Sequence, residues 1–230
     1  MIKIIGFDAD DTLWRNEDIF ERAHERFRAL LARHHPPAEV DRVLFATEMR
    51  NLALYGYGVK GFTLSCLETA VELTGGQVTG AEMAEILATG RDMLAHPIEL
   101  LADVAEVVPA LARDYRLILI TKGDLHHQER KVAASGLAPH FHAVEIVSEK
   151  DGAAYDRIRL RHGLSWGEFA MVGNSLKSDI LPVLGLGGAG VHIPYHLTWA
   201  HEHAEEPPRG QPRYRRVERL GQLPPLLPEL

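Results

Sequence analysis

The sequence has 230 residues, of which 46% are hydrophobic and 25% charged, and this ordinary globular composition excludes a disordered chain. The 32 acidic residues outnumber the 25 lysines and arginines, and the net charge of -7 argues against a general nucleic-acid binder, which needs a basic face. No apolar run reaches the roughly 18 residues of a membrane-spanning helix. Because Cys66 is the single cysteine and no signal-peptide pattern is present, we expect a cytoplasmic protein without disulfides.

The chain begins with a predicted strand that ends in acidic residues. Residues 2–7 form a β-branched apolar run that is too short for a helix and is typical of a buried strand. Asp8, Asp10 and Asp11 follow at once. Residues 16–95 then carry apolar residues at helical spacing, and proline and glycine clusters divide them into about four helices. This segment is therefore predicted to be an all-helical insertion after the first strand.

From residue 99 onward, predicted helices and strands alternate. Helices are expected at residues 99–113, 125–134, 151–162 and 176–184, and strands at residues 117–120, 143–147, 169–172 and 189–193. The tail predicts a loop, an edge strand and a short terminal helix. Such alternation is typical of an α/β fold with a doubly wound parallel sheet. We therefore expect residues 1–15 and 96–230 to form a Rossmann-like α/β core, and residues 16–95 to form a separate helical domain.

Polar residues end four of the predicted strands. They are Asp8 and Asp10 after the first strand, Thr121, Lys122 and Gly123 after the second, Lys150 after the third, and Asn174 and Asp179 after the fourth. Because ligands bind at the carboxyl ends of the strands in open α/β sheets, we expect these residues to share one site. A single Asp after a strand is often only a turn or cap residue. Four strands that end in this way favour a functional site.

This combination of groups suits phosphoryl transfer through an aspartyl-phosphate. One carboxylate can attack phosphorus, and a second carboxylate two residues later can protonate the leaving oxygen and then deprotonate water. A hydroxyl and backbone N–H groups can cradle the phosphoryl oxygens, while a lysine neutralises the nucleophile and the phosphate. Carboxylate and amide oxygens can hold Mg²⁺, which would also relieve the repulsion among the acids. We therefore expect a phosphorylated substrate. The acidic net charge and the lack of a long apolar run argue against nucleic-acid and membrane partners.

Four segments resemble the motifs of the haloacid dehalogenase-like (HAD) superfamily of hydrolases. The segment Phe7–Leu13 resembles the first motif, Asp-x-Asp-x-Thr/Val, and Ile120–Gly123 resembles the second. Lys150, with Tyr155 five residues later, resembles the third motif, and Gly173–Asp179 resembles the acidic fourth motif. The insertion between the first and second motifs is similar to the helical cap of one HAD subclass. The resemblance implies that this cap closes over the strand ends and selects a small metabolite.

The resemblance also implies the catalytic and substrate-binding roles. Asp8 would be the nucleophile, Asp10 the general acid and base, and Lys150 the partner of Asp8 and the phosphate. The groups that bind the phosphate would be those of the second motif: Thr121, the amide of Lys122, and Gly123. Within this family, dehalogenases typically lack the second acid, so Asp10 favours phosphoryl chemistry over dehalogenation.

The resemblance further implies a Mg²⁺ site. Its ligands would be Asp8, the backbone carbonyl of Asp10, Asn174 and Asp179, and either of the last two could bind the ion directly. Two positions depart from the family pattern. Asn174 stands where an Asp is usual and brings no charge, and Asp151 stands where a Pro often follows the motif lysine.

We therefore predict a Mg²⁺-dependent phosphatase that hydrolyses a small phosphorylated metabolite. A phosphotransferase or mutase of the same family is the alternative enzyme, and a non-catalytic phosphate-binding relative is a third reading that Asn174 supports. Lys60 in the helical segment is interpreted as a loop lysine rather than a Schiff-base residue. The histidines of residues 192–203 are interpreted as surface or packing residues rather than transition-metal ligands. Neither the physiological substrate nor the oligomeric state follows from these patterns.

Overall fold

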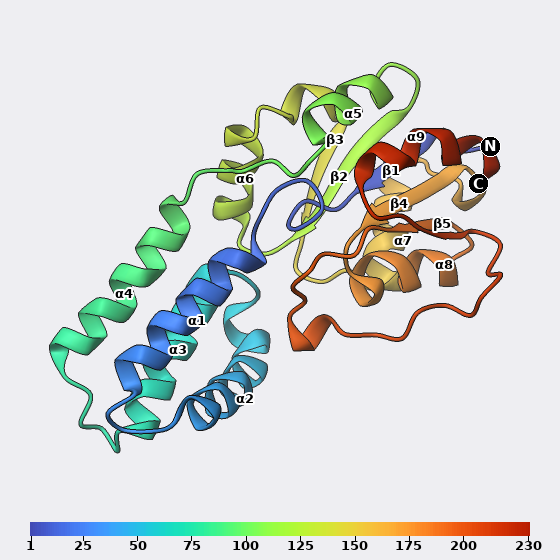
Figure 1. Cartoon of the computed structure of the whole chain (residues 1–230). Coiled ribbons are helices and arrows are strands. Elements are labelled where there is room, and N and C mark those ends of the chain that lie inside the picture. The colour runs from blue at the N-terminus through green and yellow to red at the C-terminus, as the bar shows by residue number, and fades with distance from the viewer. The chain divides into compact units, whose positions relative to one another are not determined.

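The computed structural model describes all 230 residues of the protein. The chain divides into two compact units. The first comprises Met1–Glu17 and Ile98–Leu230, and the second comprises Asp18–Pro97. Figure 1 labels their helices and strands. The chain therefore leaves the first unit soon after its first strand and returns to it after an inserted segment.

Six parallel strands form the sheet of the first unit. They are β1 (Ile4–Phe7), β2 (Arg116–Lys122), β3 (Ala143–Val147), β4 (Phe169–Gly173), β5 (Ala189–His192) and β6 (Tyr214–Arg216). Their order is β3-β2-β1-β4-β5-β6, and each neighbouring pair is parallel. Because the connections run outward from β1 in both directions, the predicted doubly wound parallel sheet is confirmed. The edge strand predicted in the tail is β6.

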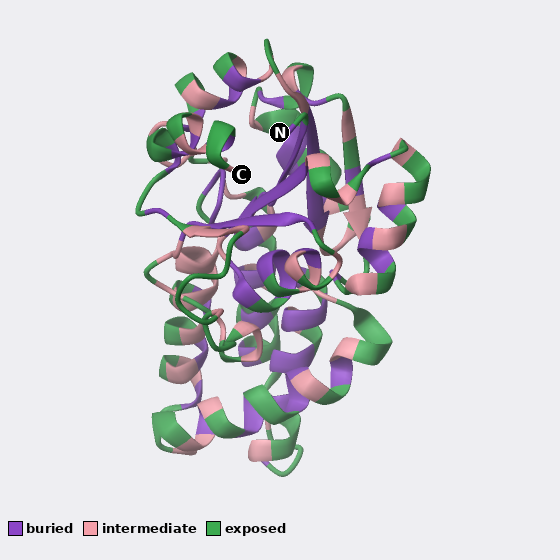
Figure 2. Ribbon diagram, turned by 90° about the vertical axis from the view of Figure 1, so that its right-hand side faces the viewer, coloured by how far each residue is buried: buried purple, intermediate pink, exposed green.

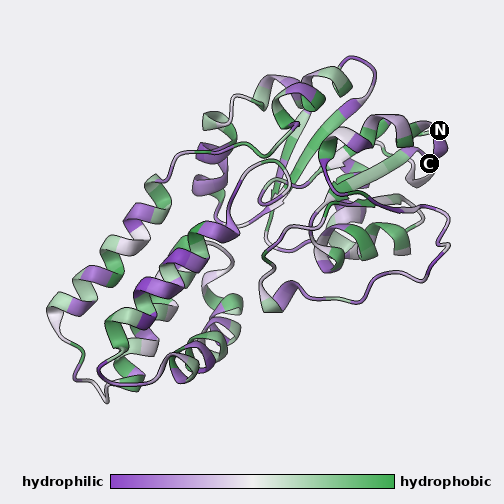
Figure 3. Cartoon of the chain, viewed as in Figure 1, coloured by the Kyte–Doolittle hydropathy of each residue, from purple (hydrophilic) through white to green (hydrophobic).

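Helices flank this sheet and bury its apolar side chains. The helices of the first unit after the insertion are α5 (Val104–Leu111), α6 (Leu125–Ala134), α7 (Gly152–His162), α8 (Leu181–Gly185) and α9 (Leu223–Leu226). Ile5 and Phe7 belong to one core cluster, whereas Ile4 belongs to another, as expected for a strand whose side chains alternate between two faces. The central strands are buried in Figure 2 and hydrophobic in Figure 3. β1 is therefore the centre of the unit.

Two helix boundaries differ from the prediction. The helix expected at residues 99–113 begins only at Val104, because the preceding residues pair with the chain beyond β1: the amide of Leu101 donates to the carbonyl of Leu13 at 2.9 Å. The helix expected at residues 176–184 consists of a π-helical turn, Leu176–Ile180, followed by α8. Its first turn is widened, and the amide of Ser178 donates to the hydroxyl of Ser175 at 3.0 Å.

The second unit contains the predicted helices of the insertion. They are α1 (Glu17–Leu31), which starts at the last residue of the first unit, α2 (Pro37–Tyr55), α3 (Val59–Leu73) and α4 (Gly80–Ala95). The helices pack around an apolar cluster that includes Phe27, Leu44 and Phe62. A capping box begins α4, in which Thr79 and Glu82 bond each other's backbone amides. In neither unit does a helix combine the length and apolarity that crossing a membrane requires.

Candidate active site

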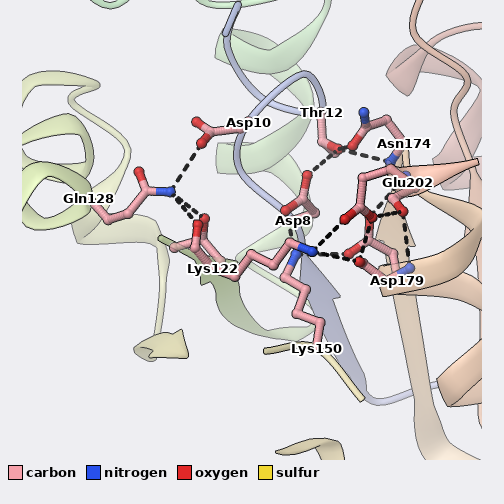
Figure 4. A network of polar contacts seen from close by, with 12 residues as sticks. Asp8, Asp10, Thr12, Lys122, Gln128, Lys150, Asn174, Asp179 and Glu202 are labelled. Carbon is pink, nitrogen blue, oxygen red and sulfur yellow. Dashed lines mark hydrogen bonds and ion pairs between the residues drawn. The ribbon is translucent and has the colours of Figure 1, made fainter. Parts of the chain in front are cut away.

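Asp8 lies immediately beyond β1, at the carboxyl end of the central strand (Figure 4). Its amide donates to the carbonyl of Val172 at 2.9 Å, so β4 holds its backbone. Its Oδ2 accepts a hydrogen bond of 2.8 Å from Thr12 Oγ1. The same hydroxyl oxygen accepts a bond of 3.1 Å from the Asn174 amide and lies 3.3 Å from Asn174 Oδ1. Thr12 therefore joins the groups that follow β1 and β4.

Lys150 is buried between two carboxylates. Its Nζ donates to Asp8 Oδ1, and it donates to Asp179 Oδ1 at 2.8 Å. Burial raises the pKa of Asp8 to about 7, although Lys150 opposes this rise and Asp179 adds to it. Burial lowers the pKa of Lys150, but the charges of Asp179 and Asp8 outweigh that effect and keep the ammonium protonated. The site therefore holds a buried cation between two acids.

Asp10 is held by three donors from two segments of the chain. Its Oδ1 accepts from Trp14 Nε1 at 2.6 Å and lies 2.5 Å from Lys131 Nζ. Its Oδ2 accepts from Gln128 Nε2 at 3.0 Å. Burial raises the pKa of Asp10, but the charge of Lys131 and the three hydrogen bonds lower it below the ordinary 3.8. The carboxylate is therefore ionised at neutral pH in this arrangement.

Thr121 lies near the end of β2 and is 1% exposed. Its Oγ1 accepts a bond of 2.9 Å from Gln128 Nε2, which also donates to the Lys122 carbonyl at 2.9 Å. A hydroxyl can donate as well as accept, so Thr121 can also donate to an anionic ligand. Gly123 has a φ of +140°, which side chains rarely adopt, and it lets the chain turn from β2 into α6.

Glu202 reaches the strand ends from the segment after β5. It lies 2.5 Å from Lys122 Nζ and accepts bonds from Ser175 Oγ at 2.6 Å and Ser178 Oγ at 2.5 Å. Burial raises the pKa of Glu202, but Lys122 and both serines lower it to about 2. The side chain of Lys122 is therefore engaged by a carboxylate, and the role that the sequence resemblance implies concerns its backbone amide alone.

The structure thus places Asp8, Lys150, Asn174 and Asp179 in one bonded network, and a second network joins Asp10 to Thr121 through Gln128. Sequence reasoning did not assign four residues of these networks: Thr12, Gln128, Lys131 and Glu202. Thr12 completes the first-motif pattern. Gln128 and Lys131 are three residues apart on α6, so they share one face of that helix. No local signal points to Glu202, because it joins these networks only through long-range contacts.

A histidine of residues 192–203 bonds a residue of these networks. His192 Nε2 bonds the Asn174 carbonyl at 3.0 Å, and burial lowers the pKa of this histidine. The rings of His196 and His201 contact Tyr195 and Trp199. No group of three or more His, Cys, Asp and Glu side chains is arranged to hold a metal ion. The loop position expected for Lys60 is wrong, because Lys60 is the second residue of α3 in the helical unit.

The oxygen donors near β1 and β4 fit a hard cation. Asp8 Oδ2 and Asn174 Oδ1 both lie within hydrogen-bond distance of Thr12 Oγ1, so these two oxygens converge. Asp179 lies beside them, where one of its oxygens accepts from Lys150 at 2.8 Å and the other from the Ser175 amide at 3.0 Å. Mg²⁺ usually binds only a few protein oxygens and completes its coordination with water and phosphate oxygens. The residues present therefore fit this ion, and the side-chain oxygens of Asp8 and Asn174 could hold it.

Comparisons with known proteins place the chain in a family. The model of the haloacid dehalogenase-like hydrolase family matches residues 2–185, so the chain belongs to that family of enzymes and the resemblance of its motifs is confirmed. A haloacid dehalogenase-like family hydrolase from Xanthomonas campestris is 43% identical, with a TM-score of 0.85 over 99% of this chain and 89% of that one. The N-acylneuraminate-9-phosphatase of Mus musculus is 26% identical over 198 residues, 81% of this chain and 79% of the relative. YfnB of Bacillus subtilis, solved with magnesium, shares the fold at 17% identity, with a TM-score of 0.66 over 98% of both chains.

Proposed function

We propose that the protein is a Mg²⁺-dependent phosphatase that hydrolyses a small phosphorylated molecule through an aspartyl-phosphate on Asp8. The observation that carries the proposal is the network at the end of β1, where Asp8 contacts the buried Lys150 and the Thr12 hydroxyl. Asp10 follows two residues later, where a second acid is needed. The similarity to N-acylneuraminate-9-phosphatases supports a phosphorylated small molecule as the substrate class.

In the first step, an oxygen of Asp8 attacks phosphorus and the bond from phosphorus to the leaving oxygen breaks. Lys150 stabilises the charge at Asp8 and at the phosphoryl group, and the Thr121 hydroxyl donates to a phosphoryl oxygen. Asp10 must be protonated to donate to the leaving oxygen. Its carboxylate is ionised in the present arrangement, so the proton is taken up when the anionic substrate binds nearby.

In the second step, the ionised Asp10 removes a proton from water, and the resulting oxygen attacks phosphorus. The bond from phosphorus to Asp8 breaks, which releases inorganic phosphate and restores the carboxylate. A bound Mg²⁺ would supply positive charge that lowers the repulsion between the acids and the phosphate. Asp8, the Asp10 carbonyl and Asn174 would hold it, while Asp179 keeps Lys150 in place.

We also propose that the helical unit, residues 18–97, acts as the cap that selects the substrate. Its insertion directly after the Asp8 segment supports this role, because a domain that covers a phosphoryl-transfer site excludes water and limits access. A cap of this kind favours a small metabolite over a phosphorylated protein.

The test is hydrolysis of p-nitrophenyl phosphate by the purified protein, with and without Mg²⁺, by the wild type and Asp8→Asn. We expect Mg²⁺-dependent release of phosphate that Asp8→Asn abolishes. Asp114→Asn is the matched control, because this exposed acid precedes β2 at the opposite end of the strand. Activity that persists in Asp8→Asn contradicts the assigned nucleophile.

A panel of sugar phosphates, including N-acylneuraminate 9-phosphate, would then identify the substrate. A phosphatase releases inorganic phosphate from its substrate. A phosphotransferase or mutase instead yields an isomerised product and needs a phosphorylated activator. The absence of any Mg²⁺-dependent turnover on this panel would favour the non-catalytic reading.

A further inference from the structure

Lys131 is a second buried lysine at the strand ends, and no motif of the family resemblance includes it. It lies on α6, three residues after Gln128, and is 7% exposed. Its Nζ lies 2.5 Å from Asp10 Oδ1 and donates to Asn16 Oδ1 at 2.9 Å. A buried lysine lowers stability unless its charge is paired. Asp10 supplies that pairing, so the two residues must be interpreted together.

The two buried lysines serve different acids. Lys150 bonds Asp8 and Asp179, whereas Lys131 bonds Asp10 and an amide oxygen. Each of the acids proposed to react therefore has its own cation. Because Lys131 is fixed at a second point by Asn16, it cannot follow a rotation of the Asp10 carboxylate without breaking that bond.

We propose that Lys131 is a positioning residue for Asp10, which holds the Asp10 carboxylate in the orientation that serves leaving-group protonation and water activation. This inference rests on the proposed function. Trp14 and Gln128 support the same orientation. Trp14, from the segment after β1, donates to Asp10 Oδ1, and Gln128, from α6, donates to Asp10 Oδ2. Lys131 acts through Asp10 and not on the substrate.

The test compares two substrates that differ in their need for a general acid. p-Nitrophenolate is a weak base and leaves without a proton, whereas the alkoxide of an alkyl phosphate needs one. For Lys131→Met we expect kcat on glycerol 3-phosphate to fall about 10- to 100-fold. The burst of p-nitrophenolate, which reports attack by Asp8, should stay within about threefold of the wild type. The matched control is Arg130→Met, an exposed neighbour on the same helix, which should leave both rates unchanged.

A double-mutant cycle then separates positioning from an independent role. Asp10→Asn should show the same selective loss, and adding Lys131→Met to it should cost nothing further, because the lysine acts only through that carboxylate. Equal losses on both substrates in Lys131→Met, or a further loss in the double variant, would overturn the inference. Wild-type rates in Asp10→Asn would instead contradict the proposed function.

Folding is monitored by circular dichroism, because loss of Lys131 leaves a buried carboxylate without its cation. Lys131→Gln keeps a hydrogen-bond donor and serves as the second variant if the methionine variant does not fold. We expect Lys131→Gln to show the same selective loss on the alkyl ester. A folded Lys131→Gln protein with wild-type kcat on both esters would also overturn the inference.

Discussion

Lys122 Nζ lies 2.5 Å from Glu202 Oε1, although 80 residues separate the two in the chain. The other carboxylate oxygen of Glu202 accepts bonds from the hydroxyls of Ser175 and Ser178. The side chains of Lys122 and Glu202 are 15% and 13% exposed. One carboxylate therefore ties the segment after β5 to the ends of β2 and β4.

Glu202→Ala should lower the free energy of unfolding of the first unit by about 2–4 kcal/mol, because two hydroxyls lose their carboxylate acceptor and a mostly buried lysine loses its nearer acid. Lys122 keeps its contacts with Ser178 Oγ at 3.0 Å and Glu149 Oε1 at 3.4 Å. Urea unfolding at pH 7 measures this loss. Glu205→Ala, an exposed acid in the same segment, is the control and should change the free energy by less than about 0.5 kcal/mol. Equal effects of the two substitutions would show that the Glu202 contacts contribute little.

The same carboxylate predicts a pH dependence of stability. Burial raises the pKa of Glu202, but the charge and hydrogen bond of Lys122 and the two serine hydroxyls outweigh this rise. The pKa falls from the ordinary 4.5 to about 2. Because the folded pKa lies below the unfolded one, the ionised group stabilises the fold above about pH 4.5. This contribution is lost as the pH falls from there toward about 2.

The measurement is the difference in unfolding free energy between the wild type and Glu202→Gln at several pH values. The difference should be largest above pH ~5 and should shrink at pH ~3, because protonated Glu and Gln then resemble each other. A difference that stays constant over this range would contradict the assigned pKa shift.

The strands were predictable because their local patterns carry the signal. β1 is buried on both faces, so its sequence is an uninterrupted apolar run, Ile4–Phe7. The start of α5 was not predictable from periodicity, because Leu101 pairs with Leu13, a residue far away in the sequence. The π-helical turn at Leu176–Ile180 also lies outside any local pattern, since its residues have ordinary helical composition.

The site shows the same division. The rule that ligands bind at the carboxyl ends of parallel strands was enough to expect Asp8, Lys150 and Asp179 near one another, and they are bonded in the structure. Glu202 could not be found in this way, because it lies in a short 3-10 helix, Ala200–Glu202, and not at a strand end. Helix periodicity could place Lys131 on the same face as Gln128, but only the fold shows that its partner is Asp10.

The capping box of α4 predicts the local stability of the helical unit. Thr79 Oγ1 accepts from the Glu82 amide at 3.2 Å, and Glu82 Oε2 accepts from the Thr79 amide at 2.8 Å. Thr79→Ala should destabilise α4 by about 1 kcal/mol, because the first turn loses an acceptor. Hydrogen exchange of the α4 amides measures the effect. Thr79→Ser keeps the oxygen and should retain wild-type protection, and equal protection in the Ala variant would contradict the role of the cap.

Gly173, the last residue of β4, tests whether Asp179 must stay beside Lys150. A Cβ at position 173 would lie 2.2 Å from Asp179 Oδ2, so Gly173→Ala must push that carboxylate away from its partners. We expect kcat on p-nitrophenyl phosphate to fall at least about tenfold, and the unfolding free energy to fall by about 1–3 kcal/mol from overpacking. Gly167→Ala is the control, because a Cβ there meets only Ser165 Oγ at 4.0 Å. A folded Gly173→Ala protein with wild-type kcat would show that catalysis does not depend on Asp179 holding Lys150 in place.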